Sequence, residues 1–237
     1  MMNEILTTIR RELTLKCDEK SRLSGERFFK EDIKLYGMKA TTLREIAKSG
    51  WTHVSHRPKT DIFNICEELW KSGYLEEAGI AIEWAIHLKK QIGPEDFRVY
   101  EHWVDKYVNN WASCDGLCNH PVGELVMKYP EFLEDLKKWT QSPNRWMRRA
   151  SSVSLIVPAR KGMFLSDIFE IAGLLLTDRD DMVQKGYGWM LKAASEAHRE
   201  AVFSFVMGHK TEMPRTALRY AIEKMPEEMR KRAMEKG

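Results

Sequence analysis

Apolar side chains recur three and four positions apart along nearly the whole chain, and no segment keeps the strict alternation that a half-buried strand requires. The segment from Asp61 to Trp70 illustrates the pattern, because Ile62, Ile65 and Leu69 fall on one face of a helix. This periodicity predicts an all-α protein.

The helix boundaries follow from residues that typically start or stop helices. Pro94 followed by Glu95 and Asp96 is typical of a first helical turn, and the Asn109-Asn110 pair is a stop. The segments expected to be helical are 5–13, 26–33, one beginning at Thr41, 61–70, 74–90, 94–109, 111–129, 130–139, 142–158, 163–176, 181–194, 198–207, 214–223 and 226–236.

Short loops join the expected helices into successive antiparallel pairs. Pairs that recur at roughly 35 to 45 residues are typical of a HEAT-like solenoid, in which each pair buries its apolar face only against its neighbours. No low-complexity linker divides the chain. We therefore predict an all-α, HEAT-like, right-handed α-α superhelix of about six helix pairs, forming one domain over residues 1–237. Such a solenoid offers a surface to a long partner, either duplex nucleic acid or a peptide.

Basic residues outnumber acidic ones only slightly, 38 against 35, but they are unevenly distributed. The stretch from Lys137 to Lys161 contains several Lys and Arg residues and no Asp or Glu. A local excess of positive charge suits a surface that faces phosphates. A solvated helix face that happens to lack acids would give the same pattern, so both interpretations stay open.

The cysteines show no paired framework, the segment from Met1 to Arg11 is too charged for a signal peptide, and no apolar run approaches the roughly 20 residues that cross a bilayer. We expect a cytoplasmic protein with reduced thiols and no membrane partner. Cys114, Cys118 and His120 suggest a metal site, but a fourth ligand is missing, so no metal is predicted. The absence of phosphate-binding glycine loops disfavours nucleotide chemistry, and no cofactor is expected.

Asp115 is the first candidate for chemistry. On a helix it shares a face with Trp111, four residues earlier, so that a carboxylate and an indole point the same way. A lone helical carboxylate is more often a solvated residue. No second carboxylate lies at a useful local spacing, and a paired acid–base mechanism is therefore not indicated.

Arginines cluster around Trp146. Arg149 lies three residues after this indole and shares its face, whereas a helix turns the adjacent Arg148 about 100° away. Arg145 lies just before Trp146. Arginine binds phosphate through two parallel hydrogen bonds, although an arginine stem can also simply cover apolar surface.

Two further aromatic positions have unusual neighbours. Trp189 follows Gly186 and Gly188 in a predicted helix that also carries Lys185, and two interior glycines indicate a close approach by a phosphate backbone or by another helix. Phe28 and Phe29 lie between Arg27 and Lys30, and core packing is expected for one of the two rings.

Taken in order, these motifs resemble the AlkD-like DNA alkylation repair family. The resemblance is carried by Arg27-Phe-Phe-Lys30, Leu35-Tyr-Gly-Met38, Asn110-Trp-Ala-Ser-Cys-Asp115, Trp146-Met-Arg-Arg-Ala150 and Gly188-Trp189. Members of that family are HEAT-like glycosylases that release N3- and N7-alkylated purines such as 3-methyladenine and 7-methylguanine.

The resemblance implies a role for each candidate residue. Asp115 matches the catalytic carboxylate, Trp111 and Trp189 match two indoles that contact the deoxyribose of the lesion, and Arg149 matches an arginine that contacts DNA. Phe28 departs from the family, which often has a tyrosine there, so stacking is kept but a hydroxyl contact is lost. Arg148, Arg145 and Lys185 are expected to add to DNA binding.

The expected function is a monofunctional DNA glycosylase that hydrolyses the N-glycosidic bond without flipping the base. Its partner is double-stranded DNA containing alkylated bases, and the protein is expected to act as a monomer. The alternatives are a non-catalytic HEAT-like binder of branched or damaged DNA and a scaffold for protein interactions. The first alternative predicts loss of the acid or of an indole, and the second predicts that binding does not depend on the arginines.

Overall fold

The computed structural model describes residues 2–235, which are all-helical apart from connecting segments and one isolated β-bridge between Lys34 and Tyr74. The predicted all-α class is confirmed. The chain divides into two compact units, Met1–Leu117 and Cys118–Gly237, and each is described by itself. The single domain expected over residues 1–237 stays a prediction.

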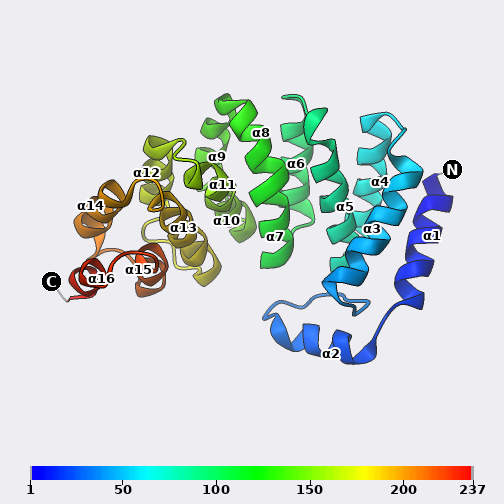
Figure 1. Ribbon diagram of the computed structural model, residues 1–237, viewed down its shortest axis with the longest axis horizontal. Coiled ribbons are helices and arrows are strands. Elements are labelled where there is room, and N and C mark those ends of the chain that lie inside the picture. The colour runs from blue at the N-terminus through cyan, green and yellow to red at the C-terminus, as the bar shows by residue number, and fades with distance from the viewer. Residues whose placement is uncertain (1, 236–237) are drawn as a thin grey trace. The chain divides into compact units, whose positions relative to one another are not determined.

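The first unit contains helices α1 to α7, which Figure 1 labels. Their bounds are α1 Met2–Leu15, α2 Glu19–Phe28, α3 Ala40–Val54, α4 Lys59–Lys71, α5 Leu75–His87, α6 Asp96–Lys106 and α7 Trp111–Leu117, with a 3-10 turn at Leu88–Lys90 after α5.

Aromatic side chains form the centre of the first unit. Trp84 on α5 and Tyr100 and Trp103 on α6 are fully buried, and α5 packs against both α3 and α4. The indole nitrogen of Trp84 donates to the carbonyl oxygen of Ala47 at 2.9 Å. A buried indole N–H without an acceptor would be costly, so this bond holds α5 against α3.

The prediction of a helix over residues 26–33 is wrong. Helix α2 begins at Glu19, after the Asp18 carboxylate accepts from the backbone N–H of Ser21 at 2.7 Å, and it ends at Phe28. Phe29 has an extended backbone, and the chain then runs without a helix to α3 (Figure 1). Helix α3 begins at Ala40 without a side-chain cap, so Thr41 does not start it.

Gly37 fixes how this non-helical segment meets α2. Its φ of 86° lies in the left-handed region, and a Cβ placed there would lie 2.6 Å from the backbone nitrogen of Arg22. Only glycine combines that backbone angle with so close an approach. The carbonyl oxygen of Gly37 also accepts from the backbone N–H of Asp18 at 2.7 Å.

The second unit contains α8 to α16, preceded by a π-helix at Cys118–Val122. The bounds are α8 Gly123–Lys128, α9 Leu133–Trp139, α10 Arg145–Val153, α11 Ile156–Arg160, α12 Leu165–Leu174, α13 Asp181–Ala194, α14 Arg199–His209, α15 Arg215–Ile222 and α16 Glu227–Met234, with a 3-10 turn at Pro130–Phe132 before α9. Residue 236, the expected end of the last helix, lies outside the described residues.

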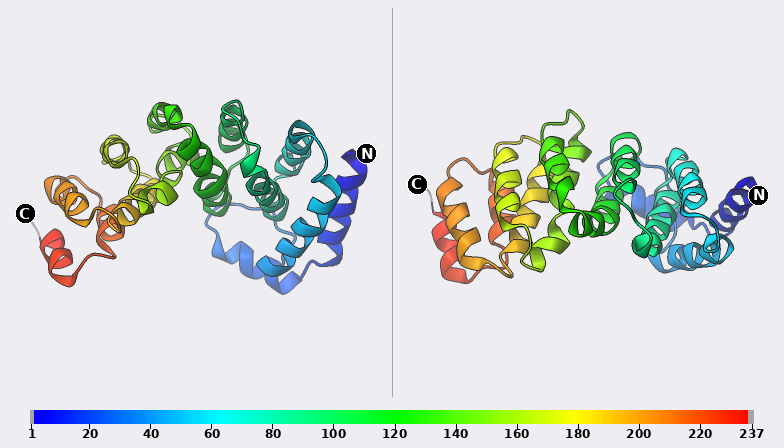
Figure 2. Two further views of the ribbon diagram at one scale, coloured as in Figure 1. Left: turned by 45° about the horizontal axis from the view of Figure 1, so that its top comes forward. Right: turned by 90° about the horizontal axis from the view of Figure 1, so that it is seen from above.

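Helix α13 is the most heavily packed element of the second unit and contacts both α10 and α15. The succession of helices in this unit can be followed in the two views of Figure 2. A Cβ at Gly188 would lie 2.8 Å from the carbonyl oxygen of Ala217 on α15, and one at Gly186 would lie 2.9 Å from the Ser152 hydroxyl oxygen on α10. Both glycines are therefore explained by neighbouring helices.

Two prolines behave differently from the sequence expectation. Pro158 was expected to close the helix that contains Arg149, but α10 ends at Val153 and Pro158 lies inside the short helix α11. Pro121 lies in the π-helix, which interrupts the single helix expected over residues 111–129. Among the described residues, no helix combines the length and apolar character needed to cross a bilayer.

Candidate nucleic-acid interface

Helix α7 presents the two residues that the sequence paired. Its start is fixed by Asn110, whose side-chain oxygen accepts from the backbone N–H of Ser113 at 2.9 Å. Trp111 and Asp115 then lie one turn apart on the same helical face, and both are half-buried. The capped helix thus holds an indole and a carboxylate side by side at a partly exposed surface.

Trp111 is the centre of a three-ring aromatic cluster. Phe29 stacks on it with a centroid distance of 5.3 Å and an interplanar angle of 20°, and Phe28 meets it edge-on at 5.7 Å. Phe28 remains 69% exposed, whereas Phe29 is half-buried. Phe29 takes the packing role expected for one of the two rings, and Phe28 is left as an exposed aromatic surface.

Two glutamates of α5 hold the segment that positions these rings. The buried Glu76 carboxylate accepts from the backbone N–H groups of Tyr36 and Gly37, at 3.1 and 2.8 Å. The buried Glu77 carboxylate accepts from the Tyr36 hydroxyl at 2.8 Å and from the Arg10 guanidinium at 3.0 Å. Burial and the Glu77 carboxylate raise the pKa of Tyr36, so its hydroxyl stays a donor. Sequence reasoning missed both glutamates, because acids are ordinary in a first helical turn.

The cysteines near α7 are packing residues. Cys114 and Cys118 are fully buried, and no group of His, Cys, Asp or Glu within residues 2–235 is arranged to hold a metal ion. A Cβ at Gly116 would lie 3.2 Å from the Ile82 side chain, which shows how closely α7 approaches α5. These small residues therefore set the position of the helix that carries Asp115.

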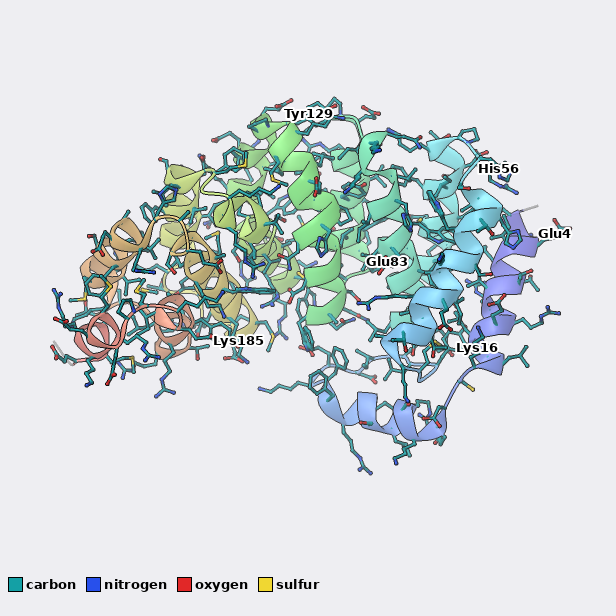
Figure 3. The ribbon with its side chains drawn as sticks, viewed as in Figure 1. Glu4, Lys16, His56, Glu83, Tyr129 and Lys185 are labelled. Carbon is teal, nitrogen blue, oxygen red and sulfur yellow. The ribbon has the colours of Figure 1, made fainter. Side chains whose placement is uncertain are left out.

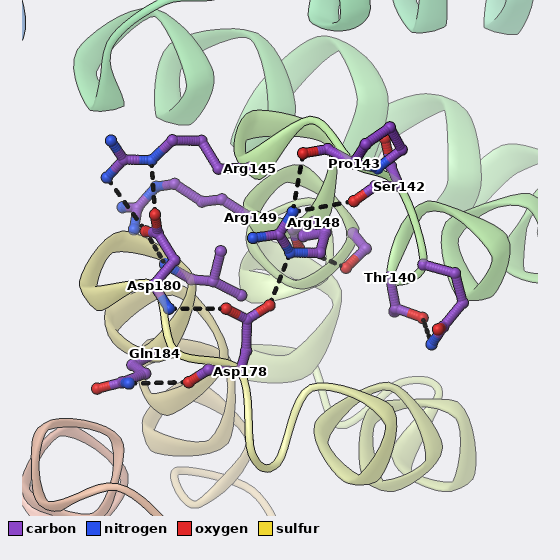
Figure 4. Close-up of polar contacts among 12 residues, drawn as sticks. Thr140, Ser142, Pro143, Arg145, Arg148, Arg149, Asp178, Asp180 and Gln184 are labelled. Atoms are coloured by element: carbon purple, nitrogen blue, oxygen red, sulfur yellow. Dashed lines mark hydrogen bonds and ion pairs between the residues drawn. The ribbon is translucent and has the colours of Figure 1, made fainter.

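The predicted arginines lie in the second unit, on α10, and two of them form ion pairs with the segment that precedes α13 (Figure 4). The Arg145 Nε lies 2.9 Å from an Asp180 oxygen, and the Arg148 Nε lies 2.7 Å from an Asp178 oxygen. Arg148 also donates to the carbonyl oxygen of Ser142 at 2.9 Å. Each aspartate comes from a different part of the sequence than the arginine it pairs with.

Arg149 is the most buried of the three arginines, with 5% of its surface exposed. Its guanidinium donates to the carbonyl oxygen of Met182 in the first turn of α13, and a Cβ at Gly186 would lie 3.3 Å from its Cγ. The side chain therefore crosses from α10 to α13 along the space that Gly186 leaves.

Trp189 and Lys185 share one face of α13, because they lie four residues apart. Trp189 is half-buried. Lys185, which is labelled in Figure 3, pairs with Asp181 one turn earlier at 2.7 Å. The Trp189 side chain is therefore partly exposed, as the sequence predicts.

The basic stretch 137–161 is therefore far less positive in space than in sequence. Lys137 contacts Glu134, Asp167 and Glu170 at 3.0 Å or less, in addition to the pairs of Arg145 and Arg148. Both sequence interpretations treated this segment as free of acids. The acids come from outside it: Glu134 on α9, Asp167 and Glu170 on α12, and Asp178 and Asp180 in the segment before α13. A local charge count could not have found carboxylates that are 30 or more residues away.

Comparisons with known proteins place this geometry in context. The family model described as DNA alkylation repair enzyme matches residues 9–225. No curated protein gives a significant match. The structure described as a predicted DNA alkylation repair enzyme from Enterococcus faecalis aligns over 90% of this chain and 98% of its own, with a TM-score of 0.81 and 16% identity.

A second solved structure is the Pseudomonas fluorescens alkylpurine DNA glycosylase AlkC bound to DNA containing an abasic site analogue. It aligns over 97% of this chain but only 64% of its own length, with a TM-score of 0.54 and 18% identity. At these identities the two likenesses show the fold, and they confirm the predicted helical solenoid class.

Proposed function

The chain belongs to the DNA alkylation repair enzyme family, and from this membership and the geometry of α7 we propose that it is a monofunctional alkylpurine DNA glycosylase. The proposed substrates are N3- and N7-alkylated purines in duplex DNA, which carry a positive charge on the base. The AlkC structure is of a glycosylase with DNA bound, which supports a DNA partner for this chain.

The proposed reaction breaks the bond between the sugar C1′ and the purine nitrogen. The bonding electron pair leaves with the purine and neutralises its positive charge, so the leaving group needs no proton. The sugar becomes oxocarbenium-like, and a fixed carboxylate at Asp115 stabilises that charge electrostatically. Water then adds to C1′ and gives up a proton, for which Asp115 is the proposed acceptor, leaving an abasic site.

The aromatic side chains are proposed to support the same transition state. Indole faces attract a positively charged sugar, which is the role proposed for Trp111 and Trp189. Phe28 is proposed to stack on DNA beside Trp111, with no hydroxyl to donate. Because these groups act from the surface of helices, the lesion is proposed to react without being flipped into a pocket.

We propose that the DNA backbone is contacted by Arg149, Arg148, Arg145 and Lys185. Arg149 is 5% exposed and donates to the Met182 carbonyl oxygen, so it would have to leave that bond to reach a phosphate. Arg145, Arg148 and Lys185 already pair with Asp180, Asp178 and Asp181, so phosphates would have to compete with these acids. Contacts of this kind position DNA more than they attract it, because paired charges contribute little net potential. We propose that the protein acts as a monomer in the cytoplasm.

One observation carries the proposal: a half-buried carboxylate lies one turn from a half-buried indole, on which Phe29 stacks and which Phe28 meets edge-on. The test is release of free base from duplex DNA carrying a single N7-methylguanine. Wild-type protein is expected to release the base, and Asp115→Asn is expected to lower the rate by about 100-fold or more, because removing one electrostatic stabiliser typically costs that much.

The control is the affinity of both proteins for duplex DNA with an abasic-site analogue, which Asp115→Asn is expected to retain. Salt-sensitive binding without base release by wild type would contradict the glycosylase and leave the non-catalytic DNA binder. No binding to any duplex would contradict both and leave the protein-interaction scaffold.

A further inference from the structure

Unpaired cations gather around α2, in the first unit and far in the sequence from the arginines of α10. An open groove of about 990 Å³ is lined by Lys20 and Arg27 of α2 and by Lys39, with Phe28 at the same surface. All three cationic side chains are exposed. Within residues 2–235, none of them forms an ion pair with a carboxylate.

The acids of α2 do not neutralise this groove. Glu19 and Glu26 both pair with Arg22 on the same helix. The carboxylate in the groove lining is Asp18, which caps α2 by accepting from the backbone N–H of Ser21 at 2.7 Å. Hydrogen bonds from Ser21 lower the pKa of Asp18, so it stays charged. The groove still presents three cations against one carboxylate.

We propose that this groove binds the phosphodiester backbone of DNA and supplies the main electrostatic attraction of the protein for its substrate. The inference rests on the proposed function, because it assigns that function a second contact surface beyond Asp115 and Trp111. Lysines act as point charges toward phosphate, and Arg27 can form two parallel hydrogen bonds to it. The hydroxyls of Ser21 and Ser24 in the same lining add uncharged donors of the kind that contact DNA backbones.

The shape of the groove favours a strand over a small anion. It is open to solvent, and its cations are exposed rather than enclosed, so a single phosphate would stay hydrated there. An extended polyanion can contact all three cations at once and release the counterions that they hold. Phe28 belongs both to this groove and to the cluster on Trp111, which makes the groove continuous with the proposed reaction surface.

The contrast with the second unit makes the proposal specific. Arg145, Arg148 and Lys185 each have a carboxylate partner, whereas Lys20, Arg27 and Lys39 form no such pair within the described residues. Binding free energy that depends on salt comes from unpaired cations that replace counterions on DNA. The salt dependence should therefore depend on α2 rather than on α10.

The test compares wild type with the triple variant Lys20→Gln/Arg27→Gln/Lys39→Gln. The probes are a fluorescent duplex with an abasic-site analogue and the same duplex unmodified, and anisotropy gives Kd at several salt concentrations. Each lost phosphate contact removes about 0.9 from the slope of log K against log salt, so the slope should become shallower by about 2 to 3. Affinity at low salt should fall at least about tenfold for both duplexes.

The matched control is Lys48→Gln/Lys89→Gln/Lys90→Gln, which removes the same charge from exposed lysines outside the groove. Its slope is expected to stay within about one contact, roughly 0.9, of wild type. Thermal melting should show all three proteins equally folded.

If the slope of log K against log salt were equal for the triple variant and the control, the proposal that the groove binds DNA would be overturned, whether or not wild type releases base. A shallower slope in the triple variant alone would support the groove even if wild type released no base, in which case only the glycosylase would fail. If wild type bound neither duplex, the groove and the proposed function would both be overturned.

Discussion

Phe28 leaves most of its ring in water while touching Trp111, which is an unusual state for a large apolar side chain. Its removal should cost little stability, because an exposed ring buries little area on folding. Stacking between a base and an aromatic ring contributes about 1 to 3 kcal/mol, so Phe28→Ala should weaken binding to abasic-site DNA by roughly 5- to 150-fold. Anisotropy and thermal melting check the two expectations.

Phe28→Tyr is the informative companion variant, because it keeps the ring and adds the hydroxyl often found in the resembled family. It is expected to bind at least as tightly as wild type. A loss of affinity in Phe28→Ala that is matched by a large fall in Tm would contradict a surface stacking role and indicate that the ring is part of the core.

At the scale of elements, α2 is positioned by one glycine and two glutamates rather than by an apolar face, since α2 has no buried residue. Gly37→Ala should therefore displace α2, because the new Cβ would lie 2.6 Å from the Arg22 nitrogen and φ would stay at 86°. We expect a loss of about 1 to 3 kcal/mol in stability. Hydrogen exchange should increase across residues 19–38, and base release should slow as Phe28 and Phe29 leave Trp111.

Gly173→Ala is the matched control for that substitution. No atom lies within 4 Å of a Cβ at Gly173, which is an exposed helical residue of α12. The alanine should stabilise the protein by roughly 0.5 to 1 kcal/mol, because it restricts the unfolded chain. If Gly37→Ala were as harmless as Gly173→Ala, the close contact between the loop and α2 would be contradicted.

The sequence predicted elements well where the signals that define them are local. Helix α13 has the predicted bounds, since Asp180 caps it and its apolar positions repeat at helical spacing. The prediction of a helix over 26–33 is wrong because the backbone becomes extended at Phe29, and the segment that follows is held by Glu76, some 40 residues later, which accepts from the Tyr36 and Gly37 amides. Trp111, Asp115 and Phe28 were found as candidates from spacing and resemblance, whereas the Asp178 and Asp180 partners of the arginines depend on packing between helices.

At the scale of the whole chain, the number of unfolding transitions depends on how the two units are joined in sequence, and the described residues have no flexible linker at that point. Helix α7 ends at Leu117 and the π-helix begins at Cys118, and both residues are fully buried. Helical repeats gain stability from their nearest neighbours, so such a chain is expected to unfold as one cooperative body. This is the single domain that the sequence predicts.

Two substitutions, one in each unit, test that expectation. Gly37→Ala lies in the first unit, and Arg148→Met removes the guanidinium that pairs with Asp178 in the second. Breaking that partly buried pair should cost about 1 to 3 kcal/mol, because Asp178 loses its charged partner. At this chain length each kcal/mol lowers Tm by about 2 to 4 °C, so both variants should shift one common calorimetric transition. If the melt instead resolves into two transitions, and each substitution moves a different one, the chain consists of two domains and the single-domain prediction is wrong.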